Sequence, residues 1–206
     1  MTQHVPSTRP PVEPAKFFPW LKRESEATWK DVKLKDNIYG FQVQAGTTWN
    51  PGLSDAEIGR FEKDMGFTFP PIYKLFLKTM NGTAKDRINI YGRSGEPERY
   101  STGYYAYPKD LAAMQDKIDW IYEENKVTNA DVEARGIPHV MPIVAHRFLV
   151  IDHCKTNPVL SMYGDDIIPY APDLTTFLVY DIFHDGAQAP GLPEDLAVEF
   201  WLRPIE

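Results

Sequence analysis

Cysteine is nearly absent from this sequence, because Cys154 is the only one among 206 residues. A single cysteine excludes a disulfide within the chain and a metal site built from several cysteines. Since disulfides belong mainly to oxidising compartments, this composition favours a reducing one, and we expect a cytoplasmic protein.

Long apolar runs are missing as well, since no stretch approaches the roughly 20 apolar residues that a membrane-spanning helix requires. Residues 1–19 contain five prolines and no apolar segment of the kind found in a secretory signal. We therefore expect no signal peptide and no membrane contact. The apolar fraction is nonetheless 43%, which is enough to build a core and excludes a chain that is disordered throughout.

Basic residues are scarce in the last quarter of the chain. Residues 151–206 hold only Lys155 and Arg203 against ten acidic residues, a net charge of −8, while the whole chain carries −7. Such a surface repels nucleic acid and attracts basic proteins, so we expect a protein partner and no direct contact with nucleic acid. Solubility alone is an equally good explanation of this charge.

Proline, by contrast, is plentiful and concentrates near the N-terminus. Residues 1–16 are Pro-rich and polar, which predicts a flexible, extended arm. Residues 17–49 are predicted to form an extension packed on the domain, with a short helix at 17–21 and a strand at 38–43. Residues 50–206 are then predicted to form one domain.

Two consecutive helices are the clearest local prediction. Ser54 and Glu57 have the spacing of a capping box, which starts a helix. Apolar residues follow at helical spacing, and Gly66 stands where a helix stops in a left-handed turn. Pro70-Pro71 then opens a second apolar-faced helix, and Asn81-Gly82 is predicted to end it with a turn.

The remaining pattern mixes strands and helices. Strands are predicted at 87–92, 103–107, 140–152 and 159–163, with Pro142 marking an edge or a bulge and a turn at 164–166. Helices are predicted at 110–125 and 174–183, and a short one at 194–201. This order predicts an α+β fold, in which helices flank a central antiparallel or mixed sheet.

The two-helix segment resembles the opening of the SMI1/KNR4 (SUKH) superfamily. The residues that carry this resemblance are Leu53-Ser54, Glu62, Met65-Gly66-Phe67, Phe69-Pro70, Tyr73, Phe76-Leu77 and Asn81-Gly82. Later residues fit the family's order of two strands and a closing helix, namely Met141-Pro142-Ile143, 148–152, 159–163 and Thr176-Phe177-Leu178. The resemblance covers about residues 50–185. The long insert from 92 to 140 departs from the pattern, and Ala145-His146-Arg147 replaces a glycine-rich turn.

The resemblance implies a function exercised through binding. Many bacterial relatives are immunity proteins that neutralise a cognate toxin, often a nuclease or a deaminase. Fungal relatives resemble regulators of cell-wall synthesis that act through protein contacts. The family pattern contains no catalytic residue to carry over to this chain, so we expect no enzyme and no cofactor.

Two groups of residues are considered as a possible catalytic site and a possible metal site. Asp152-His153-Cys154 places a base next to a thiol, but adjacent residues of a strand point to opposite faces. His139, His146 and His153 recur every seven residues, a spacing that alternates faces on a strand and does not converge on a metal. We expect neither catalysis nor a metal site from them. An enzyme that uses Cys154 or the histidines remains the third hypothesis.

The acidic last quarter and a cluster of tyrosines supply the candidate partner-binding residues. An acidic inhibitor can occupy the basic cleft of a toxin that acts on nucleic acid, and tyrosines are frequent at binding hot spots. Those same tyrosines suit a buried sheet surface equally well. The candidates are Tyr104, Tyr105, Asp152, Asp165, Asp166 and Asp173.

The leading hypothesis is therefore an immunity protein that binds a basic toxin domain. The alternative is a regulatory scaffold without a toxin partner, which the Pro-rich arm would favour because such arms serve as ligands for other modules.

Overall fold

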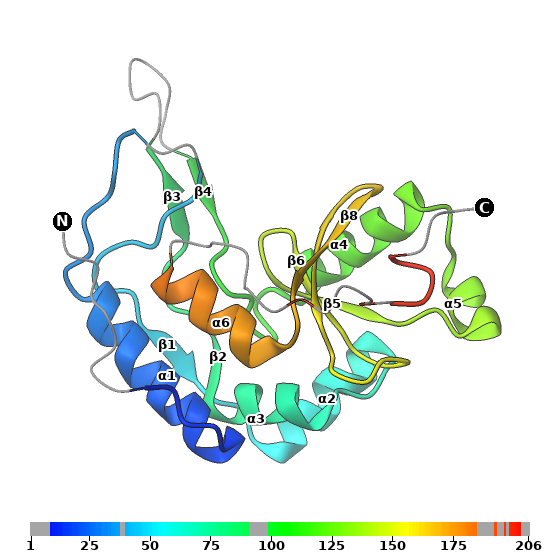
Figure 1. The fold of residues 1–206 in the computed structure, drawn as a ribbon, viewed down its shortest axis with the longest axis horizontal. Coiled ribbons are helices and arrows are strands. Elements are labelled where there is room, and N and C mark those ends of the chain that lie inside the picture. The colour runs from blue at the N-terminus through cyan, green and yellow to red at the C-terminus, as the bar shows by residue number, and fades with distance from the viewer. Residues whose placement is uncertain are drawn as a thin grey trace.

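The first half of the fold holds three helices and two pairs of short strands, and the second half holds a four-stranded sheet with three further helices (Figure 1). The computed structural model describes residues 9–37, 40–90, 99–184, 192, 196 and 198–202. Within them the helices are α1 (Pro14–Trp29), α2 (Asp55–Met65), α3 (Pro71–Thr79), α4 (Leu111–Glu124), α5 (Asn129–Arg135) and α6 (Leu174–Phe183).

The strands form three antiparallel groups. β1 (Trp49–Pro51) pairs with β2 (Met80–Thr83), and β3 (Arg87–Asn89) pairs with β4 (Arg99–Ser101). The main sheet has the order β5 (Val140–Val144), β6 (Arg147–Val150), β7 (Val159–Tyr163) and β8 (Asp166–Ala171). The predicted α+β fold is confirmed.

The predicted pair of helices is confirmed as α2 and α3, and its local signals work as expected. The Ser54 hydroxyl accepts a hydrogen bond from the Glu57 backbone N–H, and the Glu57 carboxylate accepts one from the Ser54 N–H at 2.8 Å. Gly66 ends α2 with a left-handed φ of 82°. Helices α4 and α6 also match the ranges predicted for them to within one residue at either end.

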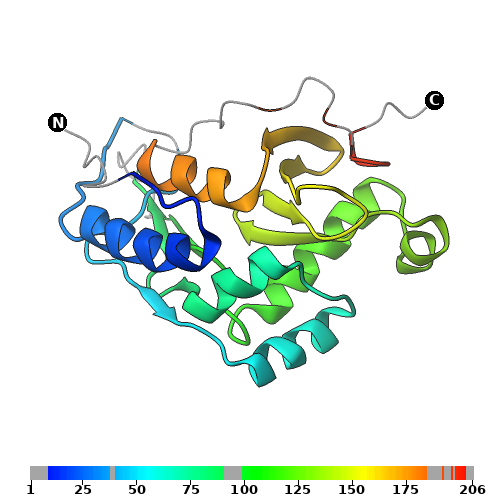
Figure 2. The same ribbon diagram turned by 60° about the horizontal axis from the view of Figure 1, so that its bottom comes forward.

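The main sheet is covered on both faces. Alternate residues of its strands enter two apolar clusters, as β6 illustrates: Leu149 packs with helices α1, α3 and α6, while Phe148 and Val150 pack with α4. Period-two alternation of this kind is what a strand between two layers requires. Figure 2 shows α6 and α4 on opposite sides of the sheet.

Both outer strands of this sheet carry a proline. On β5, Pro142 lies beside an irregularity in the register, as predicted. The outer side of β5 is met by the chain at 104–105, where the Tyr105 N–H donates to the Ile143 carbonyl at 3.2 Å and Tyr104 forms a bridge with Val144. On β8, Pro169 pairs with Leu160.

Helix α1 belongs to the main core, although it precedes the stretch of family resemblance. Its buried apolar residues are Phe17, Phe18, Trp20, Leu21 and Trp29. Trp29 packs on Trp49, and the Trp49 indole N–H donates to the Ser25 hydroxyl at 2.7 Å. The helix is longer than the predicted segment at 17–21, and it begins at Pro14, within the stretch expected as an extended arm. Residues 1–8 lie outside the described part.

One turn prediction and one strand prediction are wrong. Asn81-Gly82 lies inside β2 rather than in a turn, because the Asn81 side chain pairs with both the N–H and the carbonyl of Tyr107. Residues 103–107 are not a regular strand, since β4 lies at Arg99–Ser101 and residue 104 forms only an isolated bridge.

Other differences concern length and omission. The strand expected at 87–92 ends at Asn89 among the described residues, and β1, β8 and α5 were not predicted at all. Of the strand expected at 38–43, residues 38 and 39 lie outside the described part, and Gln42 forms an isolated bridge with Ile88. Of the helix expected at 194–201, residues 194, 195 and 197 lie outside the described part, and residues 199–201 form a turn rather than a helix.

Candidate partner-binding site

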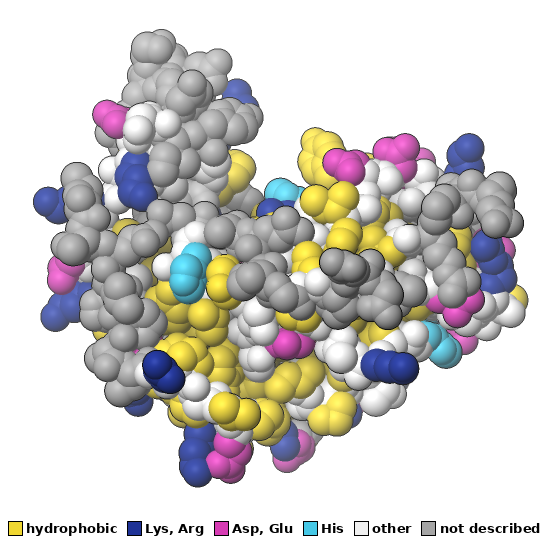
Figure 3. Space-filling view, viewed as in Figure 1, with side chains coloured by type: hydrophobic (Ala, Val, Ile, Leu, Met, Phe, Trp, Pro, Cys, Tyr) yellow, Lys and Arg dark blue, Asp and Glu magenta, His cyan; other side chains and the backbone are white. Residues whose placement is uncertain are grey.

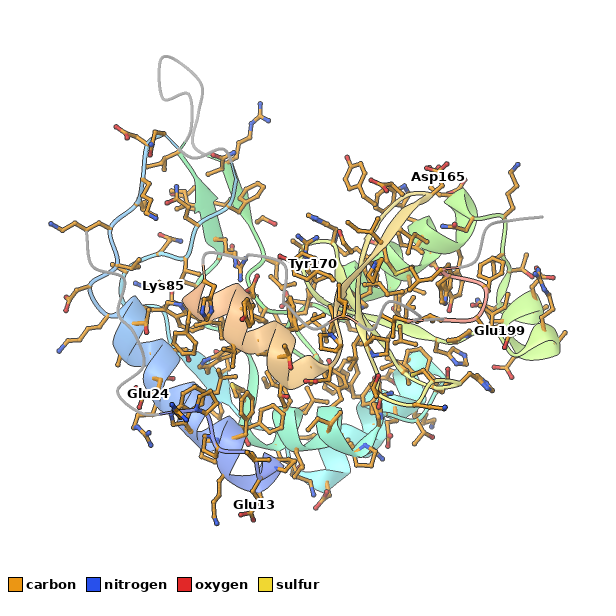
Figure 4. The ribbon with its side chains drawn as sticks, in the orientation of Figure 1. Glu13, Glu24, Lys85, Asp165, Tyr170 and Glu199 are labelled. Carbon is orange, nitrogen blue, oxygen red and sulfur yellow. The ribbon has the colours of Figure 1, made fainter. Side chains whose placement is uncertain are left out.

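The β7–β8 hairpin brings acidic and apolar side chains together at the surface. Gly164, with φ 61°, and Asp165 form the two-residue turn between the strands. Asp165 and Asp166 are exposed, and Tyr163 and Ile168 beside them are 67% and 48% exposed. Figure 3 shows hydrophobic and acidic side chains next to one another at this tip, and Figure 4 labels Asp165 there.

Helix α4 supports the tip of this hairpin. The Trp120 ring meets the Tyr163 ring edge-on, with 5.2 Å between centroids. The Asn125 amide donates to the Gly164 carbonyl at 3.1 Å, which fixes the turn to the end of the helix. We call the exposed set Tyr163, Asp165, Asp166 and Ile168 the hairpin surface.

Asp152, a candidate from the sequence, has an internal role. Its carboxylate accepts a hydrogen bond from the His139 backbone N–H at 2.8 Å, and its second oxygen lies 2.7 Å from the His139 ring Nδ1. Burial raises the pKa of this carboxyl, but the two hydrogen bonds from His139 outweigh it, so that the pKa lies below its usual value. Asp152 thus ties the end of β6 to the start of β5.

Asp173 is likewise occupied, because it caps the N-terminus of α6. Its carboxylate accepts from the Thr176 backbone N–H at 2.8 Å and from the Thr175 hydroxyl at 2.6 Å. A side chain that satisfies a helix N-terminus in this way stabilises the helix and leaves little for a partner.

The two candidate tyrosines are buried. Tyr104 is 1% exposed, and its hydroxyl donates to the Asp181 carboxylate, which also pairs with Arg87 at 2.8 Å. Burial and the Asp181 charge raise the pKa of Tyr104. Tyr105 is 9% exposed, and burial raises its pKa to about 12. Of the six candidates, only Asp165 and Asp166 therefore lie side by side at the surface.

The acidity of the last quarter does not form one face. Of its six described acids, Asp152, Asp173 and Asp181 make internal hydrogen bonds. Among the six described acids, Asp165 and Asp166 are exposed side by side at the hairpin surface, and Glu199 is exposed elsewhere.

Of the residues weighed for chemistry, His146 contacts this surface, because its ring meets the Tyr163 ring edge-on with 6.3 Å between centroids. Cys154 is partly buried and makes a 3.9 Å contact from its Sγ to the Val150 carbonyl, and burial raises the pKa of its thiol. His153 lies in a turn with φ 50°. No three His, Cys, Asp or Glu side chains of the described ranges are grouped as a metal site would require. None of the described helices is long and apolar enough to span a membrane.

One basic side chain near the hairpin surface was not among the candidates. Arg147, on β6, extends across β7, where its guanidinium Nη1 donates to the Ser161 hydroxyl at 2.7 Å. Its Cζ lies 3.8 Å from the centroid of the Tyr170 ring on β8. The preceding residue, His146, has its pKa lowered to about 4, chiefly by burial and then by the charges of Arg147 and Lys117.

Sequence reasoning also missed Tyr163 and Ile168, for an identifiable reason. Side chains at 159–163 point alternately to the two faces of the strand. The sequence does not show which of them the helices leave uncovered. The exposed pair would have emerged only from knowing that residues 166–171 form the neighbouring strand, in which Ile168 pairs with Ser161.

The protein is an α+β domain in which helices cover both faces of an antiparallel sheet. Its candidate site is a surface of exposed side chains, as in a protein-binding domain. Comparison with known families then identifies it: residues 52–179 match the SMI1/KNR4 family (SUKH-1), and the chain belongs to that family. The resemblance deduced from the sequence is confirmed. No curated protein and no solved structure gives a significant match.

Proposed function

We propose that this chain is a protein-binding module that serves as an immunity protein, neutralising a cognate toxin by occupying a basic part of its surface. Family membership supports binding to a protein, and the toxin, a nuclease or deaminase domain, is the finer part of the proposal. The protein would act in the cytoplasm, without catalysis or cofactor.

The observation that carries the proposal is the hairpin surface. It joins two exposed apolar side chains, Tyr163 and Ile168, to two exposed carboxylates, Asp165 and Asp166. Large apolar side chains anchor a partner when they are buried in the complex, while charges at the rim accelerate association. A surface of this kind suits a partner with a hollow lined by Lys and Arg.

The test is co-expression with the C-terminal domain of a large protein, where one is encoded next to this chain in its genome. If that domain stops the growth of a bacterial host, this chain should restore growth, and the two purified proteins should form a complex. Failure of both growth protection and complex formation would contradict the immunity function.

Charge reversal assigns the binding to a surface. Asp165→Lys with Asp166→Lys should slow association by about tenfold or more at low salt and weaken its dependence on salt. The matched control reverses Asp31 and Asp36, which are exposed after the end of α1. If both double variants changed binding equally, the effect would reflect net charge and the hairpin surface would not be the site.

A further inference from the structure

The guanidinium of Arg147 has an incomplete set of partners. Its plane stacks on Tyr170, and one of its N–H groups donates to Ser161. A guanidinium has five N–H donors in a rigid, planar fork. Stacking uses a face and not an edge, so the geometry leaves donors at the edge of the fork for another acceptor.

Arg147 also lacks a counter-charge among the described residues. Only two arginines of these residues are half-buried rather than exposed, Arg87 and Arg147. Arg87 pairs with the Asp181 carboxylate at 2.8 Å, whereas no described carboxylate lies within ion-pair distance of Arg147. A partly buried cation is poorly hydrated, so that an acceptor of opposite charge gains more from it than from an arginine in open water.

The position of Arg147 relates it to the hairpin surface. The sheet register aligns Arg147 with Ser161 on β7 and Ser161 with Ile168 on β8, and the next aligned pair is Tyr163 with Asp166. Arg147, Ser161 and Ile168 are aligned on neighbouring strands, so their side chains leave the sheet on the same face. Figure 4 places Tyr170 nearer the centre of the molecule than Asp165 at the tip. Along the strands Arg147 is therefore level with Ile168, while Asp166 is level with Tyr163 beside the turn at Asp165.

We propose that Arg147 is the receptor for a carboxylate, an Asp or Glu side chain of the protein partner, which it binds through the open edge of its fork. The partner of this surface then presents an acid opposite Arg147 and basic groups opposite Asp165 and Asp166. This proposal rests on the proposed function for the identity of the partner but not for the chemistry of the site. A carboxylate fits better than a phosphate, because the adjacent Asp165 and Asp166 repel a doubly charged group more strongly.

A titration with phenylacetate tests the chemistry without any partner. Arginine side-chain N–H signals of the full chain are followed by NMR, with phenylacetamide as the uncharged analogue and inorganic phosphate as the second anion. We expect the Arg147 signal to shift saturably with phenylacetate and at least about tenfold more weakly with the other two.

Two variants complete this test. Arg147→Lys keeps the charge but removes the fork, and it should weaken phenylacetate binding, followed on the Tyr163 ring signals, by about tenfold. Arg135→Gln is the matched control, because Arg135 also lies over an aromatic ring, that of Phe200 at 5.2 Å, on the exposed side of α5. Equal binding of phenylacetate and phenylacetamide, tighter binding of phosphate, or an unchanged Arg147→Lys variant would each overturn the proposal.

If the co-expressed toxin domain binds, the complex gives a second readout. Arg147→Lys should accelerate dissociation by about tenfold or more and leave the salt dependence of association unchanged, in contrast to the reversal of Asp165 and Asp166. If Arg147→Lys left the dissociation rate of the complex unchanged, the role of Arg147 in recognition would be refuted. A missing complex combined with saturable phenylacetate binding would refute the immunity function alone, so the two failures are distinguishable.

Discussion

Gly82 lies where the fold leaves no space for a side chain. Its φ is +69°, and a methyl group there would lie 2.6 Å from the Tyr104 carbonyl oxygen and 2.7 Å from the Ala106 N. Both neighbours are backbone atoms, which move only together with the chain that adjoins β5. The Asn-Gly pair of the family pattern is therefore a close contact between two segments rather than a turn.

Gly82→Ala should lower the free energy of unfolding by about 3 kcal/mol, because it adds overpacking to an unfavourable backbone conformation. Urea unfolding followed by circular dichroism measures the change. The control is Gly59→Ala in the exposed part of α2, where an added methyl group meets no atom within 4 Å. This second substitution should raise the free energy of unfolding by about 0.5–1 kcal/mol through helix propensity. A small loss at Gly82 would mean that the 104–106 segment yields easily.

His146 makes the stability of the fold dependent on mild acid. Its pKa falls from the ordinary 6.5 to about 4, because burial disfavours the charged ring and Arg147 and Lys117 repel it. The unfolded chain thus binds a proton at higher pH than the folded one does. The stability that the neutral ring contributes is complete above pH 6.5 and is lost progressively as the pH falls toward 4.

We therefore expect His146→Gln to flatten the decline in unfolding free energy between pH 6.5 and 4. Urea unfolding at several pH values in this window measures it, with the exposed His184 changed to Gln as the control, which should follow the unmodified protein. Parallel curves for all three proteins would show that the His146 ring ionises in the folded state as it does in water.

At the scale of the element, the predictable parts were those with a local signal. Capping and helical spacing located α2, and a short apolar run ended by Gly164-Asp165-Asp166 located β7. Helix α5 carries a capping box of its own, Thr128 with Asp131, but it is short and Val132 is its only buried residue, so it has no apolar stripe to notice. Its capping box was the local signal from which this helix could have been predicted.

Strand β8 escaped prediction for a different reason. Pro169 interrupts its apolar run, and a proline within a run argues against a central strand. The proline is tolerated because β8 is the last strand of the sheet among the described residues, with β7 as its neighbour in the strand order. Edge position is a property of the assembled sheet and has no local sequence signal.

In the candidate site too, the features with a local sequence signal were predictable and those that depend on the assembled sheet were not. The turn at Asp165 was predictable from Gly164-Asp165-Asp166, and both acids are exposed as a turn implies. Asp173 and Asp152 were grouped with them by sequence distance, although helix capping and the bond to His139 occupy them elsewhere. The placement of Arg147 depends on Tyr170 two strands away, a contact that no local pattern reports.

At the scale of the whole molecule, the core is larger than the segment that matches the family. The match begins at residue 52, yet α1 contributes five buried apolar side chains to the main core. Burial of a large apolar side chain stabilises by about 1.5–3 kcal/mol, so these five contribute on the order of 10 kcal/mol. Total stabilities of domains are roughly 5–15 kcal/mol, and the helix is therefore decisive for folding.

A chain of residues 50–206 should consequently fail to unfold cooperatively, whereas one of residues 13–206 should keep the melting temperature of the full chain. Differential scanning calorimetry distinguishes the two. The shorter deletion is the control, because it keeps α1 from Pro14 onward. A cooperative transition in the 50–206 chain would show that the sheet and the remaining helices close a core without α1.

The two prolines on the outer strands govern how copies of this protein meet each other. Pro142 on β5 and Pro169 on β8 each withhold a backbone N–H from any further strand. The Tyr105 N–H already occupies the Ile143 carbonyl on the β5 side. Strand addition from a second molecule, the first step toward fibrous aggregates, is thereby hindered at both edges. The hairpin surface can thus present apolar side chains to a partner beside sheet edges that disfavour pairing with a second copy.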